Sequence, residues 1–226
     1  MQPYFFPYIG YWQLIHAVDK YVIFDDVNYI NRGWINRNRI LYRGNVRYLN
    51  VYLKKASQNK KINEIEVNDD GENAKNLLLL TEAYRKAPHF DEAYPVIEKI
   101  LMQKEKNLAR YNGFLIRSVC EYLGIETPLV YSSEIDKDDG LKGQHKIMAI
   151  CKALGATDYC NAIGGVSLYD RSYFLQNGIG LNFLKTEDIK YKQFGTEFYE
   201  NLSIIDVMMF CDADCIRKML ERYELT

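Results

Sequence analysis

A pair of carboxylates followed by arginines is the stretch of this chain with the clearest chemical potential. Residues 25–39 read DDVNYINRGWINRNR, so Asp25 and Asp26 stand at the end of a predicted strand, ahead of Arg37 and Arg39. Ligands in open α/β sheets sit at the carboxyl ends of strands, and arginine binds phosphate or carboxylate through two parallel hydrogen bonds. We expect Asp25 or Asp26 to accept a proton, a role that requires burial or a neighbouring like charge to raise the carboxyl pKa.

The arginines belong to an alternating run of asparagine and arginine at positions 36–39. In an extended segment, successive side chains point to opposite faces, so this alternation places like residue types on one face. A solvated charged loop is the alternative, and it explains the charges but less easily the alternation. The pattern therefore predicts that Asn36, Arg37 and Arg39 contact a substrate.

The N-terminal stretch QPYFFPYIGYWQL has the layout of an anion-binding site. Gly10 lies at the mouth of a predicted helix, where free backbone N–H groups and a partial positive charge favour phosphate. Nucleotidyl-transferring enzymes place a His-x-Gly-His signature at such a position, but here Tyr8 and Tyr11 stand in place of the histidines. A neutral phenol donates a hydrogen bond yet lacks the charge of an imidazolium, which argues against ordinary adenylyl transfer. Ligand contact and simple packing both stay open for the two tyrosines.

A glycine-rich turn follows a predicted strand in the segment NAIGGVSLYD. Gly164 and Gly165 could present backbone N–H groups to an anion, and Asn161 could add a hydrogen bond to a sugar. The spacing differs from that of a P-loop or a Rossmann fingerprint, so a plain turn is the alternative. The five cysteines form no disulfide framework, and Asp212 is better explained as a helix N-cap than as a metal ligand. We predict no metal site.

The elements that must position these residues alternate between strands and helices, which predicts an α/β fold. After the N-terminal loop we expect a helix over 11–18, a short strand, and a hairpin that turns at residues 43–45. Residues 71–124 have helical periodicity and form a predicted helical insertion that ends at a glycine. Strands and helices then alternate again, and helices close the chain. With no repeat or linker, we expect one domain over 1–226.

Composition limits the classes of function. The chain has 226 residues, of which 48% are hydrophobic, and its 29 basic and 30 acidic residues give a net charge of −1. This balance gives no strong signal for nucleic acid. No apolar run reaches the roughly 18 residues that a membrane span requires, and the first residues do not have the pattern of a secretory signal. We therefore expect a cytoplasmic protein.

Four motifs together resemble the WbqC-like family of bacterial proteins: QPYFFPYIGYWQLI, DDVNYINRGWINRNRI, GATDYCNAIGG and FYENLSIIDVMMF. The similarity covers essentially the whole chain. Members of that family tend to occur in gene clusters for O-antigen and other surface polysaccharides, and one proposed role is the attachment of glycine or another acyl group to the amine of a nucleotide-linked amino sugar. The family usually has a short apolar strand before its Gln-Pro, whereas this chain begins at Met1-Gln2.

The resemblance and the residues lead to one hypothesis. We expect an α/β, nucleotidyl-transferase-like (HUP-like) layered sheet with a helical insertion, and a transferase that acts on a nucleotide-linked amino sugar. The helix start at Gly10 and the arginines would hold the diphosphate, and Tyr4 or Tyr8 would stack on a ring. The expected substrate-binding residues are Gln2, Tyr4, Tyr8, Gly10, Tyr11, Asn36, Arg37, Arg39, Asn161, Gly164 and Gly165. A non-catalytic protein that binds nucleotides or carbohydrates is the alternative, and the sequence indicates no particular cofactor, acyl donor or oligomeric state.

Overall fold

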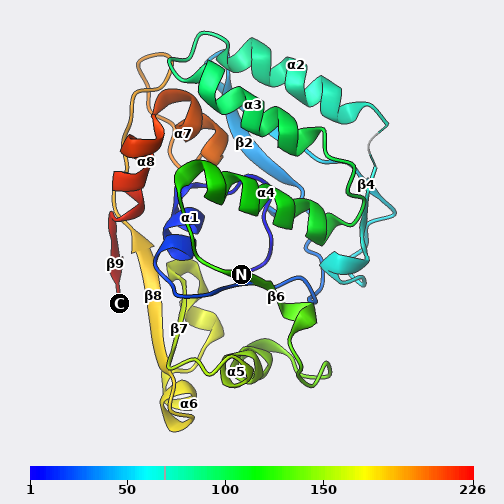
Figure 1. Ribbon diagram of the computed structural model, residues 1–226, viewed down its shortest axis with the longest axis vertical. Coiled ribbons are helices and arrows are strands. Elements are labelled where there is room, and N and C mark those ends of the chain that lie inside the picture. Colours follow the sequence, from blue (N-terminus) through cyan, green and yellow to red (C-terminus); the bar gives the residue numbers. More distant parts are fainter. Residues whose placement is uncertain (69) are drawn as a thin grey trace.

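The computed structural model describes residues 1–68 and 70–226, and it is a mixed α/β structure (Figure 1). The helices of the described part are α1 (Ile9–His16), α2 (Glu72–Tyr84), α3 (Phe90–Leu101), α4 (Leu108–Leu123), α5 (Gly143–Ala153), α6 (Arg171–Gln176), α7 (Ile204–Phe210) and α8 (Ala213–Leu220). The strands are β1 (Tyr21–Ile23), β2 (Arg37–Tyr42), β3 (Asn45–Asn50), β4 (Leu53–Lys54), β5 (Glu66–Val67), β6 (Leu129–Tyr131), β7 (Asp158–Ala162), β8 (Gly180–Thr186) and β9 (Tyr223–Leu225).

The strands form small sheets rather than one continuous sheet. Within the described residues, β1 pairs in parallel with β6, β7 pairs in parallel with β8, β9 adds antiparallel to β8, and the pairs β2–β3 and β4–β5 stand apart. Met1 extends the first of these sheets: its amino group donates to the Val22 carbonyl (2.8 Å), and its carbonyl accepts from the Phe24 N–H (2.8 Å). This is the hydrogen-bond pattern of a parallel neighbour, so Met1 pairs with β1 through these two contacts.

The hairpin of β2 and β3 forms as the sequence predicts. Arg43 and Gly44 both have positive φ, +52° and +74°, which is the conformation that a two-residue turn between right-twisted strands requires. Ile40 and Leu49 are buried on one face of the hairpin, against the main core. Because strand side chains alternate, the arginines at positions 37 and 39 lie on the other face.

The segment 71–124, for which we predicted a helical insertion, contains α2, α3 and α4, and Gly124 ends α4 in the left-handed conformation with φ +70°. In Figure 1 the first two of these helices lie over β2, while α4 runs through the middle of the molecule. The Tyr131 hydroxyl lies 1.9 Å from the place where a β-carbon at Gly113 would stand. A larger residue there would push β6 away from α4. The sequence prediction missed β9, which follows the last helix.

A chain of hydrogen bonds connects β2 to α2 and α7. The Leu41 N–H donates to the Tyr84 hydroxyl (3.0 Å), which donates to a carboxylate oxygen of Asp206 (2.7 Å) in α7. Tyr191 and Gln193 donate to the other oxygen at 2.8 and 2.9 Å. Burial raises the pKa of Asp206, although the three donors act in the opposite direction. The position of β2 therefore depends on the insertion and on the C-terminal helices.

Asn112 in α4 connects two loops that are far apart in sequence. Its buried amide donates to the carbonyls of Pro3 (2.9 Å) and Ile35 (2.7 Å). These loops precede α1 and β2, so one side chain fixes the N-terminal loop against the start of the hairpin.

We expect Asn112→Ala to lower the free energy of unfolding by about 3 kcal/mol, because two buried carbonyls lose their donor at a cost of about 1–3 kcal/mol each. Urea unfolding followed by circular dichroism measures this change. The control Arg117→Ala, on the exposed side of the same helix, should stay within about 0.5 kcal/mol of wild type. Equal stability of the Asn112 variant and wild type would contradict the role of this amide.

Candidate functional site

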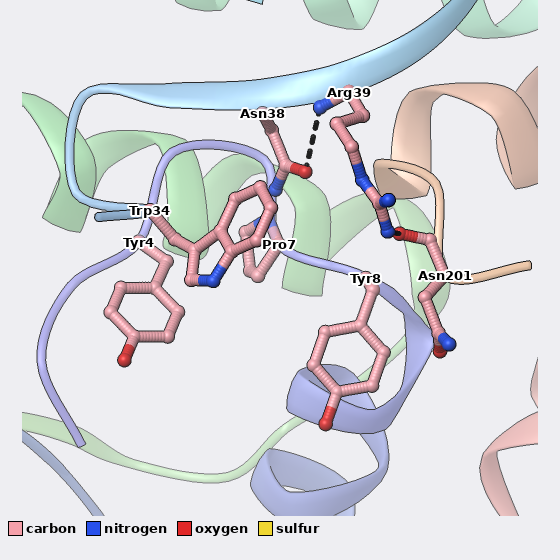
Figure 2. A pocket seen from close by; sticks show the side chains of 7 residues that line it. All are labelled: Tyr4, Pro7, Tyr8, Trp34, Asn38, Arg39 and Asn201. Carbon is pink, nitrogen blue, oxygen red and sulfur yellow. Dashed lines mark hydrogen bonds between the residues drawn. The ribbon is translucent and has the colours of Figure 1, made fainter. Parts of the chain in front are cut away.

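Three distant parts of the chain line one pocket, the N-terminal loop, the start of β2 and the loop before α7 (Figure 2). The cavity has a volume of about 300 Å³, at the small end of the range for ligand sites and large enough for a sugar ring. The residues that line it are Tyr4, Pro7, Tyr8, Trp34, Asn38, Arg39 and Asn201.

The N-terminal loop is fixed in a strained conformation. Phe6 has φ +42°, a value that costs energy for a bulky residue unless its surroundings impose it. Its carbonyl accepts hydrogen bonds from the Asn38 amide (2.8 Å) and the Ser203 hydroxyl (2.8 Å), and the Phe5 N–H donates to the Trp34 carbonyl (2.9 Å). The loop is therefore held by β2 and by the start of α7, which are the same elements that complete the pocket.

Tyr4 and Tyr8 point their rings into the pocket (Figure 2). Neither hydroxyl has a hydrogen-bond partner among the residues described. Burial raises the pKa of both phenols, and for Tyr4 the nearby Tyr8 adds to the effect. Both side chains are therefore neutral donors at physiological pH, with hydroxyl groups available to a ligand.

Arg39 supplies the positive charge of the pocket. One guanidinium nitrogen donates to the Asn201 carbonyl (3.0 Å), and the guanidinium lies 5.5 Å from the centre of the Trp34 ring. Its Nε is buried without a hydrogen-bond acceptor, and in the described part of the chain no carboxylate forms an ion pair with this arginine. The pocket thus contains a cation whose charge is not neutralised, next to an unused donor.

Gly10 allows Tyr8 to pack closely on the start of α1. A β-carbon at Gly10 would lie 2.5 Å from the Tyr8 ring and 2.5 Å from the Thr186 hydroxyl oxygen. The glycine faces these two side chains. The space left by its missing side chain is therefore filled by Tyr8 and Thr186 and not by a ligand. The predicted phosphate contact at this position is not part of the pocket lining.

Three of the predicted binding residues hold the scaffold together. Tyr11 is buried, and its hydroxyl donates to the Gln2 carbonyl (2.9 Å). The Asn36 amide donates to the Val51 carbonyl (3.0 Å), and its oxygen accepts from the Tyr29 hydroxyl (2.7 Å). Because these polar groups already have protein partners, Tyr11, Asn36 and the Gln2 backbone support the pocket and do not line it.

Arg37 lies outside the pocket on the same face of the hairpin as Arg39. Its guanidinium donates to the Gly33 carbonyl (3.2 Å) and to the Arg32 carbonyl, and it lies 4.5 Å from the centre of the Tyr48 ring. The alternation of residues 36–39 therefore separates two functions: the asparagines bind backbone groups of the fold, and the arginines face outward.

The glycine-rich turn does not join this site. The Asn161 amide donates to the hydroxyls of Tyr159 (3.1 Å) and Tyr169 (3.0 Å), and its oxygen accepts from the Ala162 N–H (2.8 Å). Gly164 and Gly165 lie in a 3₁₀ helix that follows β7. The plain turn is the interpretation that these contacts favour.

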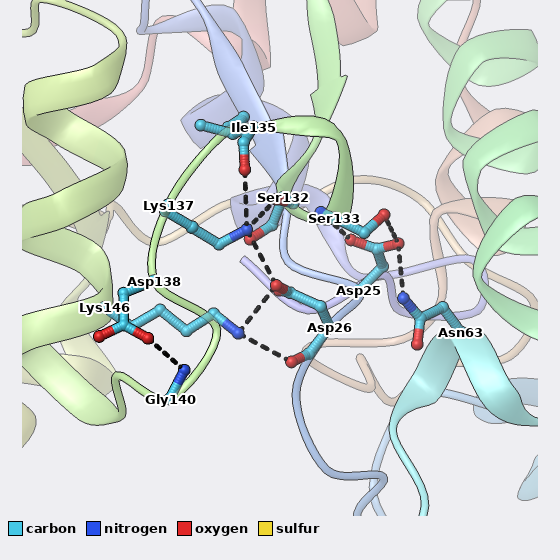
Figure 3. A network of polar contacts seen from close by, with 10 residues as sticks. All are labelled: Asp25, Asp26, Asn63, Ser132, Ser133, Ile135, Lys137, Asp138, Gly140 and Lys146. Atoms are coloured by element: carbon cyan, nitrogen blue, oxygen red, sulfur yellow. Dashed lines mark hydrogen bonds and ion pairs between the residues drawn. The ribbon is translucent and has the colours of Figure 1, made fainter.

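The two predicted catalytic carboxylates lie in a polar cluster at the end of β1 (Figure 3). Asp25 is buried and accepts from the N–H (2.9 Å) and the hydroxyl (2.6 Å) of Ser133. Asp26 lies 2.8 Å from the ammonium of Lys146 and 3.0 Å from that of Lys137, and each of these three side chains is at most 4% exposed. The cluster connects β1 to the loop after β6 and to α5.

The pKa of Asp26 argues against a general base at this position. Burial acts to raise the pKa, but the ammonium groups of Lys146 and Lys137 outweigh it, so the pKa is lowered. A carboxylate of lowered pKa holds its proton weakly and is a poor base at neutral pH. Neither aspartate is among the residues that line the pocket.

Comparison with known proteins identifies the family of this chain. The model of the WbqC-like protein family matches residues 2–218. The chain belongs to this family. An uncharacterized protein of Mycobacterium tuberculosis, Rv1507c, is 28% identical to it over 217 residues, which cover 95% of this chain and 93% of the relative. No solved structure matches the chain. Among the described residues of this WbqC-like protein, no helix has both the length and the apolar character to span a bilayer.

Sequence reasoning missed four residues of the pocket: Pro7, Trp34, Asn38 and Asn201. Three of them lie within motifs that were recognised, the N-terminal stretch and the segment 25–39, but Asn201 is 162 positions from its partner Arg39. The available signal for Asn201 was its place in FYENLSIIDVMMF, one of the four motifs typical of the family.

We expect Asp26→Asn to lower the free energy of unfolding at neutral pH by about 3–5 kcal/mol, because two buried ammonium groups lose their counter-charge. The pKa of Asp26 in the folded state lies below its unfolded value. The carboxylate therefore stabilises the fold above about pH 4 and loses this effect as the pH falls through the folded-state pKa. Urea unfolding at several pH values should show the gap between wild type and variant closing on acidification.

The control is Asp136→Asn, an exposed aspartate in the same loop, which should match wild type within about 0.5 kcal/mol throughout. Equal free energies of unfolding of wild type and Asp26→Asn at neutral pH would contradict the structural role of the cluster. A difference between them that grows in acid would contradict it too.

Proposed function

We propose that this WbqC-like protein is a transferase that acts on a nucleotide-linked amino sugar, joining glycine or another acyl group to the sugar amine during the synthesis of O-antigen or another surface polysaccharide. The observation that carries the proposal is the convergence of the N-terminal motif, Arg39 and Asn201 on one pocket. Residues of three motifs typical of the family thus meet around a single cavity.

The pocket has the chemistry of a sugar site. Tyr4, Tyr8 and Trp34 provide flat apolar faces, and such rings stack on the C–H faces of a pyranose while their polar tips bind hydroxyl groups. The volume of about 300 Å³ fits one ring rather than a whole nucleotide-sugar. The remainder of such a ligand would extend onto the surface beside the pocket.

The unpaired charge of Arg39 favours an anionic ligand. A guanidinium without a carboxylate partner among the described residues matches the oxygens of a diphosphate, which accept charge-assisted hydrogen bonds. A neutral sugar alone would leave this charge without a partner in a partly buried site. A sugar linked to a diphosphate satisfies both features of the pocket.

The proposed fold is of the nucleotidyl-transferase-like type. The parallel pairs β1–β6 and β7–β8, which belong to separate small sheets, and the parallel hydrogen bonds of Met1 on β1 are the type of strand pairing that a nucleotidyl-transferase-like layer uses. In such a layer the loop that leads into α1 is a ligand-binding loop. The position of the pocket at this loop is consistent with the proposal.

The proposed reaction joins the sugar amine to an activated acyl donor. The amine nitrogen forms a bond to the acyl carbon, the activating group leaves with its electron pair, and the nitrogen loses a proton to solvent. The neutral phenols of Tyr4 and Tyr8 are suited to donate hydrogen bonds to the oxyanion that develops on the acyl group. In this scheme Asp25 and Asp26 support the fold and do not remove the proton.

A binding protein without turnover is the second candidate, and one observation favours it. No carboxylate, imidazole or thiol is among the described residues that line the pocket. Incubation with an amino-sugar nucleotide and activated acyl donors, followed by mass spectrometry, separates the two: an amide product supports the transferase, and binding without product supports the alternative.

We expect Arg39→Ala to weaken the binding of a nucleotide-sugar by about 1.5–3 kcal/mol, the range for hydrogen bonds to charged groups. Arg39→Lys should recover only part of this loss, because an ammonium cannot reproduce the planar fork. Isothermal titration calorimetry with a panel of UDP- and dTDP-linked amino sugars measures both effects.

The matched control is Arg47→Ala, which removes an exposed arginine from the same hairpin on the face opposite Arg39. This variant should bind like wild type. If both alanine variants bind with wild-type affinity, Arg39 does not hold the ligand and the assignment of the pocket is wrong.

A further inference from the structure

We infer that the exposed face of the β2–β3 hairpin beside the pocket binds the nucleotide half of the ligand, with the base stacked on aromatic rings and the diphosphate between two guanidinium groups. This inference rests on the proposed function and assigns it a second subsite. The residues concerned are Arg37, Tyr48, Trp34 and Arg39, named below the aromatic–arginine ladder.

The four side chains form a continuous series. The Arg37 guanidinium lies 4.5 Å from the centre of the Tyr48 ring, and the Tyr48 and Trp34 rings are 6.5 Å apart at an angle of 32°. The Arg39 guanidinium then lies 5.5 Å from the Trp34 ring. Because Trp34 and Arg39 also line the pocket, the ladder begins where the sugar site ends.

The strand register explains why these residues share one face. Arg39 is the direct partner of Tyr48, and Arg37 stands two residues before Arg39 on β2. Side chains of directly paired residues, and of residues two apart, point to the same side of a sheet. The intervening Ile40 and Leu49 point to the other side, where both are buried. The core thus fixes the orientation of the ladder.

The rings of the ladder are exposed, which requires an explanation. Tyr48 is 43% and Trp34 is 38% exposed, although burial of large aromatic side chains is a major source of stability. Adjacent exposed aromatic rings at the rim of a pocket are typical of binding surfaces. Stacking with a planar base would cover them.

The charges of the ladder select an anion. In the described part of the chain, Arg37 and Arg39 donate to backbone carbonyls and form no ion pair. Arg43 of the same hairpin, in contrast, pairs with Glu82 of α2. Two guanidinium groups on one face, neither neutralised, match the charge of a diphosphate. Aromatic rings interleaved with arginine also form the usual platform for nucleobases, and such stacking tolerates any base.

Calorimetry with UDP and dTDP, which lack the sugar, tests this subsite directly. We expect Tyr48→Ala to weaken the binding of both diphosphates about tenfold, the effect of losing one base stack, and Arg37→Ala to weaken them by a similar factor. Tyr48→Phe, which keeps the ring, should bind like wild type. Binding of glucosamine 1-phosphate should be unchanged in both Tyr48 variants.

Two controls keep the outcomes distinct. Tyr52→Ala removes another exposed ring (49%) that is not in the ladder, and Arg47→Ala removes an arginine from the opposite face; neither should change the binding of the diphosphates. Melting curves of all variants establish that they are folded.

The result that overturns the inference alone is wild-type affinity for the diphosphates in Tyr48→Ala and Arg37→Ala, or an equal loss of glucosamine 1-phosphate binding in Tyr48→Ala. The proposed function would then stand without this subsite. If the wild-type protein binds neither the diphosphates nor any nucleotide-linked amino sugar, both the inference and the proposed function are overturned.

Discussion

Buried side chains that donate to main-chain carbonyls hold the N-terminal loop, and with it the pocket, in place. The loop before α1 has few main-chain hydrogen bonds of its own, and a buried carbonyl without a donor is costly. Asn112 binds the carbonyl of Pro3, and Asn38 and Ser203 together bind that of Phe6. These three side chains come from α4, β2 and the start of α7. The pocket exists because the same contacts that satisfy the loop also bring these elements together.

The protein uses its charges in two different ways. At the end of β1, Asp26 is buried with the ammonium groups of Lys137 and Lys146. Asp25 accepts hydrogen bonds from Ser133, so the cluster holds a loop in place. At the pocket, Arg39 donates to one backbone carbonyl, and no carboxylate among residues 1–68 and 70–226 forms an ion pair with it. The first arrangement stabilises the fold, and the second leaves the site dependent on a ligand for neutralisation. This difference is why we propose Arg39, rather than the buried cluster, as the charge that binds a ligand.

The elements of the fold could be predicted from sequence because they follow local rules. Periodicity identified the helices over 71–124, and the turn at Arg43-Gly44 identified the hairpin. The division into small sheets was not predictable, since strand pairing depends on contacts far apart in sequence. For the site, residue type identified Tyr4, Tyr8 and Arg39 as pocket residues, but it could not distinguish an asparagine that binds a ligand from one that binds the scaffold. Asn36 and Asn38 have scaffold partners that only the tertiary structure brings near them.

If the cavity between the N-terminal loop and β2 is the ligand site, a bound ligand must cover Trp34, and the fluorescence of this residue can report it. The chain has two tryptophans, and Trp12 is fully buried, so acrylamide can readily reach only Trp34. We expect a saturating nucleotide-linked amino sugar to protect the wild-type protein from acrylamide quenching. In Trp34→Phe, which reports Trp12 alone, quenching should be weak and insensitive to the same ligand. If acrylamide still quenches Trp34 to the same extent at a ligand concentration where calorimetry shows the ligand to be bound, the ligand binds elsewhere and this cavity is not its site.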